Sequence, residues 1–182
     1  MARLIHAPVE DNGEKMSQDN ASSSAASRAI TTLYGVLKEI GWEPRYDVES
    51  SGFVVDFDPP YLPVAYAYAA ISEPLEFFVF YLTLGVAAAA NVRDETARFL
   101  TMVNWNLMIG NFEMDYEDGM VRLRSSVCFR GTELSETLIR NTILFAMNAV
   151  ERYAERVIDV MARGKGALEA LSEANAASEE GN

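Results

Sequence analysis

The stretch from Gly110 to Gly131 constrains the fold most, because it predicts a β-hairpin held between two helices. Asp118-Gly119 is a strong turn signal, since a type I′ turn needs positive φ at both of its central positions. With these two residues in the turn, one face of the hairpin pairs acids with bases: Asp115 with Arg122 and Glu113 with Arg124. The other face is apolar, and pairs Tyr116 with Val121 and Met114 with Leu123.

Both faces of the hairpin favour this register, because a shift by one residue would destroy the charge pairs and the apolar pairs together. The acidic residues beside the turn superficially resemble a calcium loop, but they lack its spacing and its distal glutamate. A structural role in the hairpin is therefore expected for Glu113, Asp115, Asp118, Gly119, Arg122 and Arg124.

Three amphipathic patterns predict helices around the strands. In each of them apolar residues recur at spacings of three and four, which is the period of one helix face. Capping residues precede two of the patterns, and a glycine follows each of the three, as left-handed helix ends favour. The first helix is expected from residue 27 to Gly41, the second from Asn91 to Gly110 and the third from Ser135 to Gly164.

A second hairpin is expected between Val64–Ile71 and Leu75–Leu84, after a shorter strand at Phe53–Phe57. Alanines alternate with tyrosines in its first arm, and both faces of its second arm carry aromatic or aliphatic side chains. Such strands are central strands covered on both faces, or strands of which one face is covered by a partner chain.

The predicted element order is α-β-β-β-α-β-β-α. Strands joined by tight turns form an antiparallel sheet rather than the alternating arrangement of a parallel α/β fold. We therefore predict an α+β fold in which three helices pack an antiparallel sheet of about five strands. One domain over 27–168 is expected between a disordered, acidic and serine-rich tail (1–26) and an acidic C-terminal tail (169–182).

Charge and cysteine content limit the partners and the compartment. The chain carries 27 acidic and 15 basic residues, a formal net charge of -12. Phosphate binding needs clustered Lys and Arg, so we expect neither nucleic acid nor an anionic membrane as partner. The uncharged stretch Phe77–Val92 is short for a membrane span. A single cysteine, Cys128, and a start that lacks a secretory signal pattern predict a cytoplasmic protein.

No catalytic set is recognisable. Cys128 has no histidine near it in sequence, and the one histidine, His6, lies in the expected N-terminal tail, so a nucleophile–histidine system is not expected. Asp56 and Asp58 share a strand face, but two carboxylates supply fewer oxygens than hard cations need. The glycines form no phosphate-binding fingerprint. We therefore expect no enzyme activity, no metal and no cofactor.

Residues 109–122, IGNFEMDYEDGMVR, followed by Leu134-Ser135 and a long helix, resemble the YbjN family. This is a bacterial group labelled as sensory transduction regulators. The resemblance covers 90–165 closely and 27–85 in element order, and Met114 stands where leucine is usual. It implies a fold similar to type III secretion chaperones, which usually self-associate, bind partner segments and perform no chemistry.

Two functions remain open on these grounds. The first is a non-catalytic, chaperone-like protein-binding or regulatory module that acts as a homodimer and binds a protein or peptide partner. The second is a small-molecule sensor or an enzyme, with an enclosed pocket among the aromatic residues Tyr66, Tyr68, Phe78 and Phe80. The candidate residues of the partner or dimer surface are Tyr66, Tyr68, Phe78, Phe80 and Trp105.

Overall fold

A computed structural model describes residues 28–61, 63–72 and 74–180, so the expected N-terminal tail lies outside the described residues. The first helix is described over 28–39, and the later helices are η1 (Ala90–Val92, a short 3-10 helix), α2 (Arg93–Asn106), α3 (Glu136–Arg163) and α4 (Ala167–Glu180). The strands are β1 (Arg45–Asp47), β2 (Gly52–Tyr61), β3 (Val64–Ser72), β4 (Phe77–Ala87), β5 (Asn111–Met114) and β6 (Met120–Cys128).

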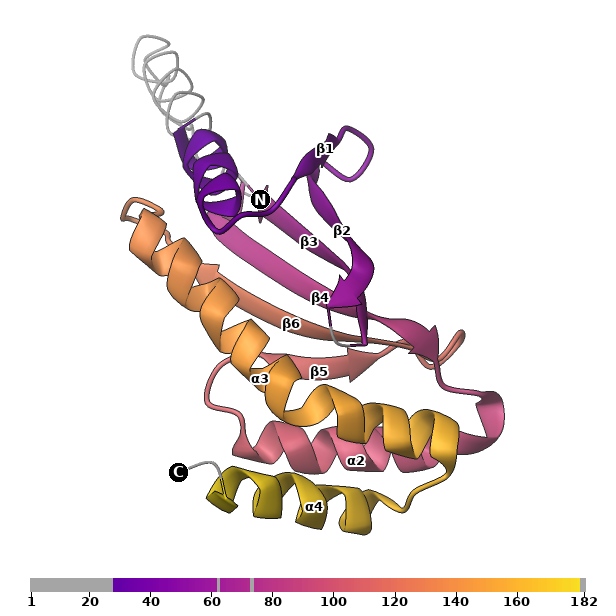
Figure 1. Ribbon diagram of the computed structural model, residues 1–182. Coiled ribbons are helices and arrows are strands. Elements are labelled where there is room, and N and C mark those ends of the chain that lie inside the picture. The colour runs from indigo at the N-terminus through magenta and orange to yellow at the C-terminus, as the bar shows by residue number, and fades with distance from the viewer. Residues whose placement is uncertain (1–27, 62, 73, 181–182) are drawn as a thin grey trace, which may run out of the picture.

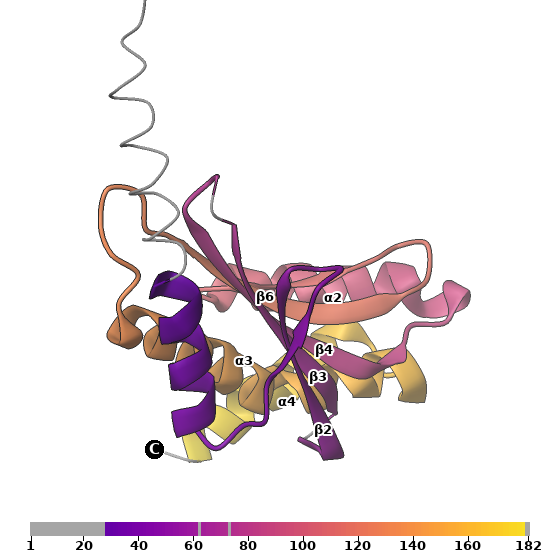
Figure 2. The ribbon, with the colours of Figure 1, turned by 90° about the horizontal axis from the view of Figure 1, so that it is seen from above.

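The strands form one antiparallel sheet in the order β1-β2-β3-β4-β6-β5 (Figure 1). Strands β1 to β4 follow one another as neighbours, and α2 then carries the chain to the far edge, where β5 begins. The first helix and α3 lie on the same side of β2, β3 and β4 (Figure 2). The expected α+β class is confirmed, with a further strand, β1, and a further helix, α4.

The two faces of this sheet differ in burial. Side chains that point toward the helices form one hydrophobic core with them, and the alternate residues of the same strands point away from it. No described helix covers that second face. The core side of the strands consists mainly of Phe53, Val55, Ala67, Ala69, Phe78, Phe80, Leu82, Phe112, Val121 and Leu123.

The hairpin of β5 and β6 has the predicted faces but a different register and turn. Glu113 pairs with Arg122, not with Arg124, so the register is displaced by two residues, a shift that keeps every side chain on its face. A longer loop, 116–119, replaces the type I′ turn, and Gly119 is its one residue with positive φ, +82°. Carboxylates stabilise this loop, because Asp115 accepts from the amide of residue 117 and Asp118 from that of residue 120, at 2.8 Å each.

The helix ends follow the predicted signals at α3 but not at α2. The Ser135 hydroxyl accepts from the Leu138 amide at 3.2 Å, and Gly164 ends α3 with φ of +71°. Asn91 does not cap α2. It lies in the 3-10 helix η1, and the N-cap of α2 is Val92, without a side-chain bond.

Most of the expected C-terminal tail is folded as α4, which packs on α2 and α3 (Figure 1). Its contacts are made by small side chains, since Ala167, Ala170 and Ala174 are buried. Alanine gives a weak amphipathic signal, whereas the many acids give a strong one for a solvated segment. The acidic residues therefore favoured a tail over a helix in the sequence.

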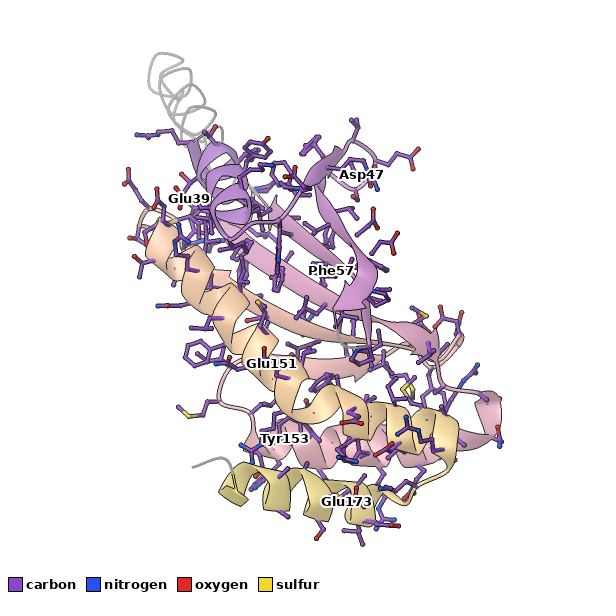
Figure 3. All side chains as sticks on the ribbon, in the orientation of Figure 1. Glu39, Asp47, Phe57, Glu151, Tyr153 and Glu173 are labelled. Atoms are coloured by element: carbon purple, nitrogen blue, oxygen red, sulfur yellow. The ribbon has the colours of Figure 1, made fainter. Side chains whose placement is uncertain are left out.

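Polar contacts hold α4 to the end of α3. Asp159 is buried and accepts from Arg156 at 2.6 Å and from Arg163. Arg156 and Lys165 also bind Glu173, at 3.0 and 2.6 Å. Glu173 lies on α4 (Figure 3). Burial raises the pKa of Asp159, but the hydrogen bonds from the two arginines outweigh it, and the net pKa is below its ordinary value. The bond to Glu173 raises the pKa of Lys165.

Candidate interaction surface

The sheet face turned away from the helices, here called the open face, arranges its side chains in rows across the strands. Residues directly opposite each other in neighbouring strands share a face, so their side chains are in contact distance. One row consists of Asp56, Tyr66, Thr83, Arg122 and Glu113. The next row consists of Val54, Tyr68, Tyr81, Arg124 and Asn111.

Tyrosines form the middle of the open face and are held by their neighbours. The ring centroids of Tyr68 and Tyr81 lie 6.1 Å apart, and the Arg122 guanidinium lies 4.1 Å from the centroid of Tyr81. The Tyr68 hydroxyl donates to the carbonyl of Ser50 at 2.6 Å. Such contacts fix the rings before any partner arrives, which lowers the entropy cost of binding.

The charges of the open face are arranged around Glu113. Its carboxylate lies 2.6 Å from Nε of Arg122 and 3.5 Å from Nε of Arg124. The sequence predicted Asp115 as the partner of Arg122, but Asp115 instead accepts an amide of its own loop. These ion pairs are exposed and add little stability. Their effect is to hold the Arg122 guanidinium over Tyr81.

A hollow of about 430 Å³ interrupts the open face where it meets the β5–β6 loop. Thr83 is the most buried residue of its lining, at 4% exposure, although it lies on the open face. The lining consists of Tyr66, Thr83, Glu113, Met114, Asp115, Asp118, Met120 and Arg122.

A second exposed apolar surface lies outside the open face, at the C-terminal end of α2 and in the residues that lead to β5 (residues 104–110, here called the α2–β5 segment). Trp105, Met108 and Ile109 are 89%, 96% and 41% exposed there. The segment is anchored, because the Asn104 side chain bonds both the carbonyl and the amide of Phe112, at 2.9 and 2.8 Å. In the sequence, Asn104 and Phe112 are eight residues apart, a spacing that gave no signal of this contact.

The five residues expected to form one partner or dimer surface lie in three places. Tyr66 and Tyr68 lie on the open face, whereas Phe78 and Phe80 point into the core with no exposed area. Trp105 belongs to the α2–β5 segment. The tyrosines and the phenylalanines are therefore on opposite faces of the sheet and do not line a common pocket.

Among the described residues, no group of three or more His, Cys, Asp or Glu side chains is placed to hold a metal ion. Asp56 lies 3.7 Å from Arg45, as an exposed ion pair. Cys128 is an exposed free thiol at the end of β6. In the part of the chain that the structure describes, no helix has the length and apolar character of a membrane span.

The solved structures that are similar to this chain include two that are described here. The first is the crystal structure of the ExsC-ExsE complex, with a TM-score of 0.54 and 16% identity, over 71% of this chain and 93% of the other. The second is the crystal structure of YbjN from E. coli, with a TM-score of 0.52 and 13% identity, over 70% of this chain and 92% of the other. At these identities the likeness shows the fold alone.

A search of curated proteins found no match. The family comparison covers most of the described fold, from the first helix to near the end of α3. Residues 29–159 match the model of the YbjN family, described as "Putative bacterial sensory transduction regulator", so the sequence resemblance is confirmed and the chain belongs to this family.

Proposed function

We propose that this protein is a non-catalytic regulatory module of the cytoplasm that binds a protein partner and acts as a homodimer. The observation that carries this proposal is the open face, on which three tyrosines and two arginines are arranged without a covering element. Sheet faces of soluble domains are normally polar when they stay exposed, so an aromatic one indicates an interaction site. Tyrosine and arginine are also the side chains most enriched in binding hot spots.

The similar ExsC structure supports the proposal, because it is a complex with another protein, ExsE. The family description as a regulator agrees with a role in binding rather than in chemistry. The proposed partner of this chain is therefore a protein segment laid across the open face.

The α2–β5 segment is the proposed dimer surface. Trp105 and Met108 are almost fully exposed, although burying such side chains would contribute roughly 1.5–3 kcal/mol each. Because the Asn104 contacts hold the segment in place, little further ordering is needed when two copies meet. A surface separate from the open face leaves the open face free for a partner.

Size-exclusion chromatography with light scattering tests the dimer. The wild type is expected at twice the mass of the chain, and Trp105→Asp is expected at the mass of one chain. Val48→Asp is the matched control, because Val48 is 79% exposed in the β1–β2 turn, and this variant should stay dimeric. A monomeric wild type contradicts the homodimer, and a dimeric Trp105→Asp contradicts this surface.

Capture of partners from native lysate tests the open face. Proteins retained by the wild type should be lost with Tyr81→Ala and kept with Val48→Asp. A set of proteins that does not change with Tyr81→Ala would contradict binding at the open face. The alternative function, a sensor or enzyme with a pocket among the aromatic strands, has no support from the placement of Phe78 and Phe80, because both are core residues.

A further inference from the structure

The hollow on the open face is a product of strand geometry. The pairing of β3 with β4 is irregular between Val64 and Tyr66, and that of β4 with β6 is irregular between Thr83 and Ala87. Bulges of this kind bend strands and re-aim side chains. Both irregularities adjoin Thr83, so the sheet bends at the position where the hollow of about 430 Å³ opens.

Of the three carboxylates that line the hollow, only one is paired with basic side chains. Glu113 is neutralised by Arg122 and Arg124. Asp115 and Asp118 each use one oxygen, Oδ1, to accept a loop amide, and no basic side chain among the described residues pairs with either of them. Each therefore retains a second carboxylate oxygen and a full negative charge at the rim of the hollow.

Thr83 supplies an independent indication of a ligand. Its side chain is 96% buried by the residues around it, as its 4% exposure shows, and it lines the hollow. None of the hydrogen bonds between described side chains involves its hydroxyl. Among the described residues, Ser125 Oγ is the one side-chain oxygen that is fully buried without a partner, so the Thr83 hydroxyl is not sealed off and can be reached from the hollow. A bound group that hydrogen-bonds the hydroxyl would account for the threonine.

We propose that the hollow receives a basic side chain, lysine or arginine, of the protein segment that binds the open face. This inference rests on the proposed function and adds the chemistry of the partner. The aliphatic part of the side chain lies against Tyr66, Met114 and Met120, which line the same hollow. The cationic head meets Asp115 and Asp118, and one of its N–H groups donates to Thr83. The chain's net charge of -12 also attracts a basic segment over longer distances.

A displayed library of random peptides, panned on the full-length protein, tests this subsite. Enriched peptides are expected to share a lysine or an arginine among apolar residues. The strongest peptide is then synthesised twice, once as selected and once with glutamine in place of the basic residue. The replacement is expected to weaken binding by about tenfold, as the loss of a charge-assisted contact does.

Variants of the protein locate the contact. The double change Asp115→Asn and Asp118→Asn removes both charges but keeps the Oδ1 acceptors of the loop, so it should preserve the fold and weaken the selected peptide about tenfold. The control is Glu133→Gln with Glu155→Gln, two exposed carboxylates far in sequence from the hollow. It removes the same charge and should leave affinity unchanged. An equal loss in the control would reduce the effect to net charge and overturn the subsite.

Thr83→Val separates a ligand contact from a structural role. It is expected to keep or raise the unfolding temperature while it weakens the selected peptide several-fold. Peptides that require Tyr81 but tolerate both the glutamine replacement and the asparagine variants would overturn the subsite and leave the proposed function standing. A library that yields no peptide dependent on Tyr81 would contradict the proposed function itself.

Discussion

The covered and the open face belong to the same strands, yet they are built on different principles. Along β4, Phe78 and Phe80 have no exposed area, while Val79 and Tyr81 between them stay partly exposed. The covered face gains its stability from burial, which is non-directional and tolerates any apolar side chain of the right size. The open face uses ring contacts and ion pairs that contribute little to stability but fix particular side chains in place. This difference agrees with the proposed division of roles, in which the covered face specifies the fold and the open face binds a partner.

The largest expected effect comes from truncating neighbours on the two faces of β4. Phe80→Ala should lower the free energy of unfolding by ~3–5 kcal/mol, because it leaves a cavity in the core. It also removes the stacked contact with Trp42, whose ring centroid lies 6.0 Å away. Tyr81→Ala should cost ~1 kcal/mol, since its ring is only partly buried. Denaturant unfolding of both variants measures the difference, and equal losses would mean that the open face is covered in the folded protein.

The fold could be predicted from the sequence, but the identity of the exposed strand face could not. Turn residues, helix periods and caps fixed the element order, because each acts within a few residues of its own position. On β4, aromatic and aliphatic side chains occupy both faces, so periodicity carries no information about which face the helices cover. The helix α4 escaped prediction for a related reason, because its buried contacts are alanines among acids.

The second expected effect concerns Gly119, where the open-face hairpin touches the β4–α2 connection. A Cβ atom there would lie 2.1 Å from the carbonyl oxygen of Ala88, and φ is +82°. Gly119→Ala should therefore destabilise the protein by ~3 kcal/mol, from strain in φ and from the clash together. Gly131 has φ of +77° and open space around it, so Gly131→Ala isolates the cost of φ, ~1 kcal/mol. Similar losses in urea unfolding would show that the backbone moves away from the clash.

The third effect tests whether the covered side also depends on polar contacts. Asp159→Asn should cost ~2–3 kcal/mol near neutral pH, because the buried carboxylate loses its charge-assisted bonds from Arg156 and Arg163. The pKa of Asp159 is lowered in the folded state, so its stabilisation is present above its unfolded pKa of about 3.9 and is lost as the pH falls through the folded value. The stability difference between wild type and variant should therefore shrink in acid. Asp47→Asn is the control, an exposed carboxylate whose loss should matter far less, and a difference independent of pH would contradict the role of Asp159.

The candidate site was partly legible in the sequence. The tyrosines of β3 and the arginines of β6 were recognisable, since their alternation survives any even shift of register. The hollow was not, because it depends on two strand irregularities and on a loop longer than the expected turn. Thr83 carried no signal at all, since threonine is common in strands and only its burial without a hydrogen bond sets it apart.

The smallest expected effect compares the two buried sheet residues that carry a hydroxyl, Ser125 and Thr83. Ser125 lies on the covered face opposite Phe80, and its Oγ has no hydrogen-bond partner among the described residues. Ser125→Ala should raise the free energy of unfolding by ~0.5–1 kcal/mol, because the relief of an unsatisfied hydroxyl exceeds the lost packing.

Thermal unfolding of Ser125→Ala beside Thr83→Val completes this comparison. Ser125→Ala should exceed the wild type, because Ser125 Oγ is buried without a partner, and Thr83→Val should at least match it, because valine keeps the shape of threonine. Only Thr83→Val should weaken a selected peptide, because Thr83 alone faces the hollow. A clear loss of stability in Ser125→Ala would mean that the Ser125 hydroxyl bonds a buried water. Ser125 could then no longer serve as the hydroxyl without a partner against which Thr83 is compared.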